Sequence, residues 1–170
     1  LDLGFSKSEI ASVSKLFGIW MTIAGTLIGG LVAVRIGMMR MLLIGALLVS
    51  VTNLAYAWLA TVGPDVAALT VTVSLENLAG GFGGTALIAY MSSLTSTAFT
   101  ATQYALFSSF FALPGKIMGG LSGVMVEGLG GFYWFFILTA AMGVPAVVLV
   151  WLLMRLSEPE PRAEPRAGRV

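Results

Sequence analysis

Three ionisable side chains, Lys15, Glu76 and Lys116, stand alone inside long apolar stretches of this 170-residue chain. A carboxyl group in such a setting can carry a proton, and an ammonium group can pair with an anionic ligand or with that carboxylate. A charge at the centre of a bilayer costs about 2.5 to 3.5 kcal/mol on insertion scales. The three residues therefore predict a polar pathway. Two further apolar stretches of similar length carry no charge.

The composition indicates that the solvent of this chain is lipid. Hydrophobic residues make up 58% of the sequence and charged residues 10%, whereas about a quarter of the residues are charged in soluble domains. The chain has no Cys and no His, and its net charge is +1. We therefore expect an integral membrane protein that is not an enzyme, with no metal, no cofactor and no nucleic-acid partner.

Five stretches are long enough to cross a bilayer, which takes about 20 apolar residues. The sequence predicts an all-α polytopic membrane protein with spans at about 10–34, 41–62, 66–92, 101–126 and 132–154. These spans form a transmembrane bundle over 1–156. The Pro-rich segment 157–170 predicts a disordered cytoplasmic tail.

Basic residues predict the orientation, because they accumulate on the cytoplasmic side. Five crossings place the connections near residues 35–40 and 93–100 on the same face as the C-terminus. That face carries Arg35, Arg40, Arg155, Arg162, Arg166 and Arg169, against Lys7 on the other. We expect the N-terminus outside the inner membrane and the C-terminus in the cytoplasm.

The first and fourth spans share a pattern that predicts an inverted internal repeat. Ser6 with Glu9 and Thr100 with Gln103 both fit a capping box, flanked by the hydrophobic pairs Phe5/Ile10 and Phe99/Tyr104. Each span then carries Gly-x-x-x-Gly-Gly-Leu, at Gly25, Gly29, Gly30 and Leu31 and at Gly115, Gly119, Gly120 and Leu121. A three-helix repeat unit would put one more helix before Leu1, so we expect five helices of a six-helix half.

Three segments carry a family resemblance: DLGFSKSEI at 2–10, ENLAGGFGGTA at 76–86 and FTATQYALFSS at 99–109. Together they resemble the C-terminal half of the AmpG-type muropeptide permeases of the major facilitator superfamily, over residues 1 to about 154. The resemblance implies helices 8 to 12 of a twelve-helix transporter that imports anhydromuropeptides with protons during cell-wall recycling. It also implies a missing N-terminal half as a partner, besides the lipid bilayer, protons and an anionic glycopeptide substrate.

The segment 30–40 is similar to the superfamily's loop between helices 8 and 9. Gly30, Arg35, Gly37 and Arg40 fit a gating role there, but Val34 stands where that signature has an acidic residue. Pro114 and Gly115 are faintly similar to the superfamily's kink motif. In that superfamily helices 7, 8, 10 and 11 line the cavity, and the three isolated charges fall on helices 8, 10 and 11.

We assign Glu76 to proton coupling, with a static ion pair between helices as the alternative. Lys116, Lys15 and Asn77 are candidates for contact with the substrate or for an ion pair, although Lys15 could reach the interface and Asn77 could serve packing. Residues for helix flexing or packing are Gly80, Gly81, Gly83, Gly84, Pro114, Gly115, Gly119 and Gly120. A siderophore or acetyl-CoA carrier of the same fold and a non-transporting membrane assembly module remain alternative functions.

Overall fold

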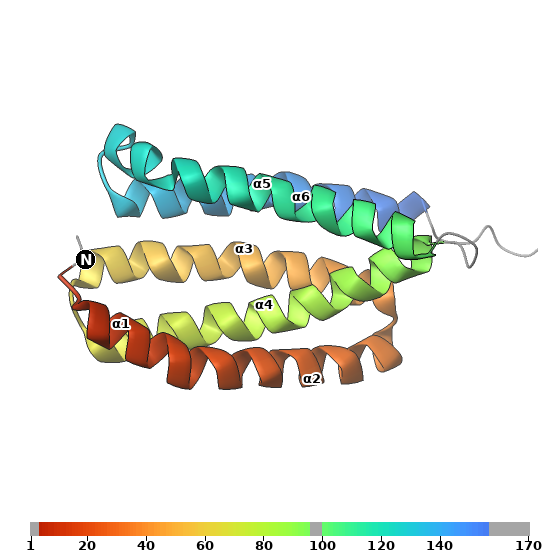
Figure 1. Ribbon diagram of the computed structural model, residues 1–170, viewed down its shortest axis with the longest axis horizontal. Helices are drawn as coiled ribbons and strands as arrows, with labels where there is room; N and C mark the ends of the chain where they lie inside the picture. The colour runs from red at the N-terminus through yellow and green to blue at the C-terminus, as the bar shows by residue number, and fades with distance from the viewer. Residues whose placement is uncertain (1–3, 96–99, 157–170) are drawn as a thin grey trace, which may run out of the picture.

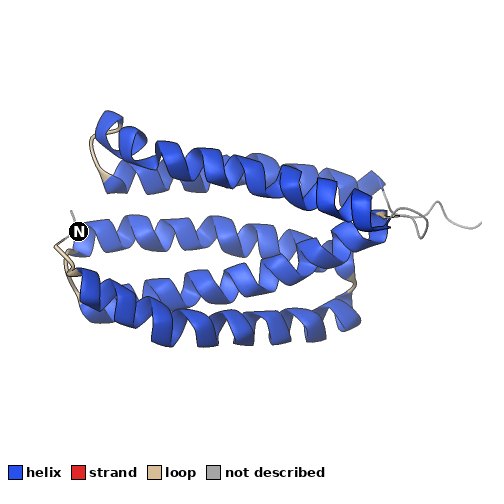
Figure 2. Cartoon of the chain, in the orientation of Figure 1, coloured by secondary structure: helices blue, strands red, loops and turns tan. Residues whose placement is uncertain are grey.

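The computed structural model describes residues 4–95 and 100–156, and its elements in these ranges are all helices (Figures 1 and 2). Helix α1 (Lys7–Val13), a π-helical turn (Ser14–Gly18) and α2 (Ile19–Ile36) form one continuous helix of 30 residues. The others are α3 (Met38–Val62), α4 (Val66–Leu94), α5 (Thr100–Gly128) and α6 (Phe132–Leu156). Five helices are thus long and apolar enough to cross a membrane, and the predicted all-α polytopic fold is confirmed.

The capping box predicted at the start of the first helix is present. The Ser6 side chain accepts a hydrogen bond from the Glu9 backbone N–H, and the Glu9 carboxylate accepts one from the Ser6 backbone N–H at 2.8 Å. Phe5 is buried, and Ile10 packs against the same apolar cluster, as a hydrophobic staple requires. The second predicted box involves Phe99 and the Thr100 side chain, which lie outside the described part of the chain.

Four of the membrane helices lie against one another in the order α2, α4, α3, α6 (Figure 1). The helices approach one another most closely at glycines, because a Cβ at such a position would overlap the backbone of the neighbouring helix. A Cβ on Gly45 of α3 would lie 2.8 Å from the Gly83 Cα of α4, and a Cβ on Gly25 of α2 would collide with the Leu78 carbonyl of α4. This order brings α3 into contact with both α4 and α6.

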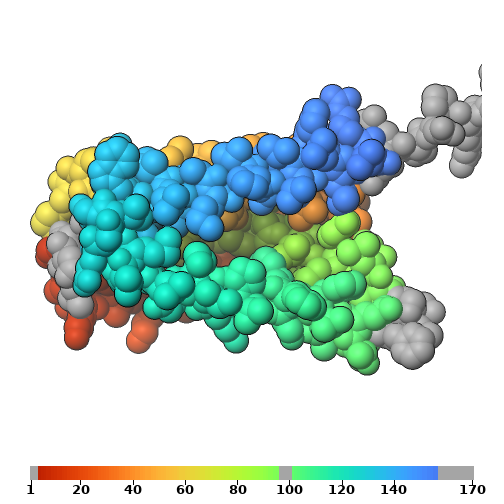
Figure 3. Space-filling model, turned by 90° about the horizontal axis from the view of Figure 1, so that it is seen from above, coloured from red at the N-terminus to blue at the C-terminus, as the bar shows by residue number. Residues whose placement is uncertain are grey.

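Helix α5 differs from the other four because none of its described side chains is buried. In Figure 3 it runs beside α6 on one face of the molecule, and the surface is hollowed between the two helices. The Pro114 predicted as a kink lies inside this helix.

Different helix ends and turns lie at the two ends of the bundle (Figure 1). The α2–α3 turn, the end of α4, the start of α5 and the end of α6 lie at one end, and the start of α1 and the turns α3–α4 and α5–α6 lie at the opposite end. At the first end the Arg155 guanidinium lies 5.2 Å from the centre of the Trp151 ring. Such pairs of a basic and an aromatic side chain suit a membrane interface.

Candidate functional site

Glu76 lies on α4, ten residues after the first residue of that helix, a distance of roughly 15 Å along its axis. Its side chain is exposed, and the Tyr56 hydroxyl of α3 donates a hydrogen bond to its carboxylate Oε2. Glu76 forms no ion pair with any residue that the structure describes. The carboxylate is therefore held by a neutral hydroxyl.

The ring of Tyr56 is fixed from its other side by α6. It stacks on Phe136 with 4.9 Å between the ring centres and 21° between the ring planes. Phe132, one turn earlier on α6, stacks on Phe136 in turn, at 6.3 Å. Glu76 is thus linked through one tyrosine to helices α3 and α6.

A groove of about 370 Å³ opens beside Glu76 between three helices. Its lining residues come from α2, α3 and α4 and are Thr22, Val49, Thr52, Glu76, Asn77, Gly80 and Gly81. A Cβ added to Gly80 would meet no atom within 4 Å, so this glycine leaves the groove wide next to the carboxylate. Hydroxyl, amide and carboxylate groups together can bind a polar ligand and accept a proton.

Asn77, the neighbour of Glu76, joins α4 to α2. Its Oδ1 accepts a hydrogen bond of 3.0 Å from the Thr22 hydroxyl, and its Nδ2 donates one of 2.8 Å to the Val73 carbonyl. Gly18, the last residue of the π-helical turn, makes this approach possible, because a Cβ there would lie 3.3 Å from Asn77 Nδ2. In this structure the Asn77 amide serves the contact between the two helices while it borders the groove.

The two predicted lysine partners stand apart from Glu76. Lys15 lies in the π-helical turn and Lys116 on α5, and both side chains are exposed. Neither forms an ion pair or a hydrogen bond with another described residue. Lys116 lies at the edge of a recess of about 350 Å³ on α5, next to Ser108 and Ser109. A contact of either lysine with a ligand stays a prediction.

The segment predicted as a gating loop is a tight turn between α2 and α3. Gly37 has a φ of 84°, which favours glycine, and it separates the last turn of α2, with Arg35, from the first turn of α3, with Arg40. Both arginine side chains are exposed, and a Cβ added to Gly30 would meet no atom within 4 Å. The gating role itself stays a prediction.

The glycines predicted for flexing or packing divide into two groups. Gly81 and Gly83 lie against α2 and α3, respectively, so they serve helix packing. The remaining ones have no atom within 4 Å of an added Cβ and are Gly80, Gly84, Gly115, Gly119 and Gly120. The identical glycine pattern of the first and fourth spans therefore has two structural outcomes, since Gly25 and Gly29 also pack closely on α4.

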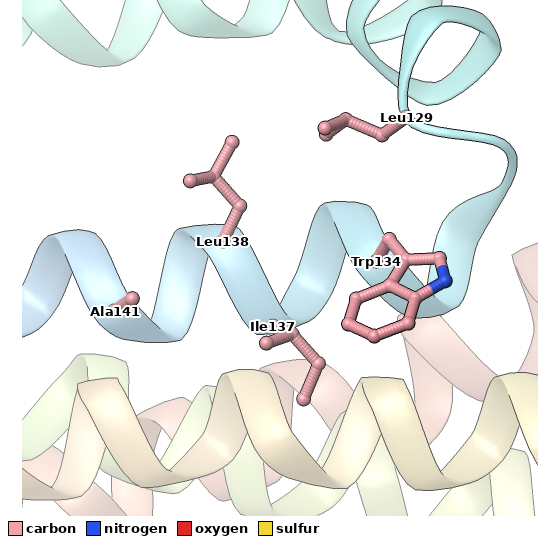
Figure 4. A pocket seen from close by; sticks show the side chains of 5 residues that line it. All are labelled: Leu129, Trp134, Ile137, Leu138 and Ala141. Atoms are coloured by element: carbon pink, nitrogen blue, oxygen red, sulfur yellow. The ribbon is translucent and has the colours of Figure 1, made fainter.

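A second recess of about 370 Å³ lies at the turn between α5 and α6 (Figure 4). Leu129, Trp134, Ile137, Leu138 and Ala141 line it. No titratable side chain is among them, so this recess can neither carry a proton nor pair with an anion. The groove beside Glu76, which has a carboxylate in its lining, is therefore the better candidate for a functional site.

Sequence reasoning found Glu76 and Asn77 but missed Tyr56, Thr22, Thr52 and Phe136. The sequence feature that could have revealed Tyr56 is a row of polar residues on α3, in the uncharged span 41–62. Ser50, Asn53 and Tyr56 follow one another at intervals of three residues there, and such spacing places side chains on one face of a helix.

The sequence matches the model of one protein family, described as the Major Facilitator Superfamily, over residues 1–169. The chain belongs to the major facilitator superfamily. It therefore belongs to a family of membrane transporters, and the predicted family is confirmed.

Several relatives within this superfamily are similar over most of the chain. A protein named putative transporter AmpG 4 from Rickettsia conorii is 35% identical over 153 residues, which cover 90% of this chain and 37% of the relative. The anhydromuropeptide permease of Escherichia coli K12 is 33% identical over 148 residues, which cover 87% of this chain and 30% of the relative. The chain thus spans about a third of the length of these relatives, and its resemblance to AmpG-type permeases is confirmed.

Proposed function

We propose that this chain forms part of a secondary transporter that imports anhydromuropeptides together with protons. The observation that carries the proposal is the Glu76 carboxylate, which borders an open polar groove between three helices of a transporter-family protein. The substrate class is suggested by the similarity to the anhydromuropeptide permease of Escherichia coli.

The partner of Glu76 supports a role in carrying protons. A carboxylate paired with a lysine is stabilised in its charged form, which opposes proton uptake. Among the residues that the structure describes, the Glu76 carboxylate is held by the Tyr56 hydroxyl and pairs with no cation. We infer that it takes up and releases a proton during each cycle. The tyrosine partner thus favours proton coupling over the static ion pair between helices.

Lys116 and Lys15 are proposed as contacts for the carboxylates of an anionic glycopeptide. Both side chains are exposed and lack an ion-pair partner in the described ranges. Their ammonium groups are therefore available to a ligand. Ammonium and carboxylate groups form charge-assisted hydrogen bonds, which are about twice as strong as neutral ones.

We place the N-terminal end of the chain outside the inner membrane and the end of α6 in the cytoplasm. The support is the basic bias: Arg35, Arg40 and Arg155 all belong to the end of the bundle that holds the α2–α3 turn. With this orientation, alternating access would move these helices against a second set around the groove.

Uptake into membrane vesicles tests the substrate and the coupling together. The full-length protein that carries these helices is expected to accumulate a labelled anhydromuropeptide when a pH gradient is imposed and to lose the accumulation when a protonophore dissipates it. Unlabelled anhydromuropeptide should compete, whereas a ferric siderophore and acetyl-CoA should not. Competition by a ferric siderophore or by acetyl-CoA would mean that the proposed substrate class is wrong and that this competitor belongs to the true one. The absence of any uptake would support a non-transporting assembly module.

A further inference from the structure

One face of α3 meets α6 through Ser50, Asn53 and Tyr56, three polar residues that lie three positions apart. Ser50 lies against Gly143, where a Cβ would come within 2.8 Å of the Ser50 Cβ. One turn on, the Thr139 hydroxyl lies 3.4 Å from the Asn53 Oδ1. The third contact of the series is the stack of Tyr56 on Phe136. Helix α6 therefore fixes the rotation of α3 and, with it, the direction in which Tyr56 points.

Tyr56 lies at the boundary between two different surroundings. Its ring borders an apolar cavity of about 220 Å³ that is also lined by Leu59, Leu69 and Val73, while its hydroxyl reaches the Glu76 carboxylate beside the polar groove. Tyr56 thus joins the apolar cavity, which its ring borders, to the polar groove, which the Glu76 carboxylate borders. No other described side chain forms a hydrogen bond with Glu76.

The titratable groups on the elements around Glu76 are few. On α4 itself Glu76 is the only charged residue. Helix α3 contributes Tyr56 and, in its first turn, Arg40; the last turn of α2 carries Arg35, and the π-helical turn carries Lys15. None of these three basic groups forms an ion pair with the Glu76 carboxylate. Helix α2 faces the groove with the neutral Thr22. The orientation of the Glu76 carboxyl group therefore depends on the Tyr56 hydroxyl.

We propose that Tyr56 is a positioning residue for Glu76: its hydroxyl aims the carboxylate into the groove, and Phe136 fixes the tyrosine ring. This inference deepens the proposed function and rests on it. The proposal assigns a role in transport to α3 and α6, the two helices whose membrane spans carry no charge.

The test compares Tyr56→Phe with a matched control, Tyr90→Phe, in the full-length protein in membrane vesicles. Both substitutions remove only a hydroxyl, but the Tyr90 hydroxyl forms no hydrogen bond with a described residue. We expect Tyr56→Phe to lower pH-gradient-driven uptake about tenfold, since a hydrogen bond to a charged group is lost. Counterflow, which exchanges substrate without net proton movement, should stay within about twofold, and Tyr90→Phe should change neither.

Labelling with dicyclohexylcarbodiimide, which attacks carboxyl groups in apolar surroundings, reads the positioning without transport. Mass spectrometry of the labelled peptide identifies the site. We expect the labelling rate of Glu76 to rise about tenfold in Tyr56→Phe, because the carboxyl is released from its donor. Phe136→Leu keeps the hydroxyl but removes the stack, and it should raise the rate by a smaller factor.

Each result bears on one of the two proposals. An unchanged labelling rate in both Tyr56→Phe and Phe136→Leu would overturn the positioning role, and so would an equal loss of uptake and counterflow. If Tyr56→Phe does not fold, Phe136→Leu carries the same test. Altered labelling without any uptake of an anhydromuropeptide would leave the positioning role in place and overturn the proposed substrate instead.

Discussion

Two neighbouring glycines on α4 are expected to respond to the same substitution in opposite ways. Gly81 lies against α2, and an added Cβ would stand 3.0 Å from the Thr26 backbone nitrogen and closer still to the Thr22 carbonyl oxygen. Gly80 faces the groove, and an added Cβ would meet nothing within 4 Å. Gly81→Ala should therefore destabilise the protein, and Gly80→Ala should not.

The change in the free energy of unfolding follows from the space that each glycine leaves for a Cβ. The Thr26 nitrogen is 0.4 Å inside the 3.4 Å at which ordinary contact begins, and it is a backbone atom, so α2 as a whole must move away. Overpacking of this kind costs about 1 to 3 kcal/mol, and the shift also strains the hydrogen bond between Thr22 and Asn77. Alanine in a helix interior gains about 0.5 to 1 kcal/mol over glycine. We expect a net loss of up to about 2.5 kcal/mol for Gly81→Ala and a gain of up to about 1 kcal/mol for Gly80→Ala.

Thermal unfolding of the two purified variants in the same mild detergent measures this difference. The melting temperature of Gly81→Ala should fall below that of the unsubstituted protein, and that of Gly80→Ala should equal or exceed it. Equal melting temperatures for the two variants would refute the close approach of α2 and α4 and, with it, the helix order from which the groove is built.

Four further substitutions test separate parts of the structure. Ser6→Ala removes the helix cap and should cost about 1 kcal/mol, measured by thermal unfolding; no change would mean that the cap is not formed in the membrane. Thr22→Val leaves the Asn77 Oδ1 without its donor and should cost about 1 to 3 kcal/mol in the same assay. Gly80→Leu should narrow the groove and reduce uptake severalfold at unchanged stability, and normal uptake would exclude the groove from the substrate path. Lys116→Gln should raise the KM for an anionic substrate about tenfold at unchanged protein level, and an unchanged KM would remove Lys116 from the binding site.

The five helices were predictable because each needs only a local property, about 20 apolar residues between turn or charge signals. The cap at Ser6 was predictable for the same reason, since Glu9 lies three residues away. The helix order was not predictable, because the apolar residues of a membrane helix point in all directions and do not reveal which face meets a neighbour. Identical glycine patterns illustrate this: Gly25 packs on α4, whereas a Cβ added to Gly115 would meet no atom within 4 Å.

The candidate site was predictable only in part. Glu76 stood out because a lone carboxylate in an apolar span is costly, and the same reasoning directed attention to the two lysines as its partners. The structure gives Glu76 a tyrosine from an uncharged span instead. A tyrosine carries its polar atom at the end of a long apolar ring, so it is inexpensive in a membrane helix and leaves no charge in the sequence to reveal it.

The central claim is that Glu76 carries the coupled proton, and Glu76→Gln tests it most directly. Gln keeps the size of the side chain and can still form hydrogen bonds, but its amide neither takes up nor releases a proton under the conditions of the uptake assay. We predict that the variant reaches the membrane in normal amounts, loses uptake driven by a pH gradient and retains counterflow of the same substrate. Gradient-driven uptake by Glu76→Gln that equals that of the unsubstituted protein at every pH would contradict the account.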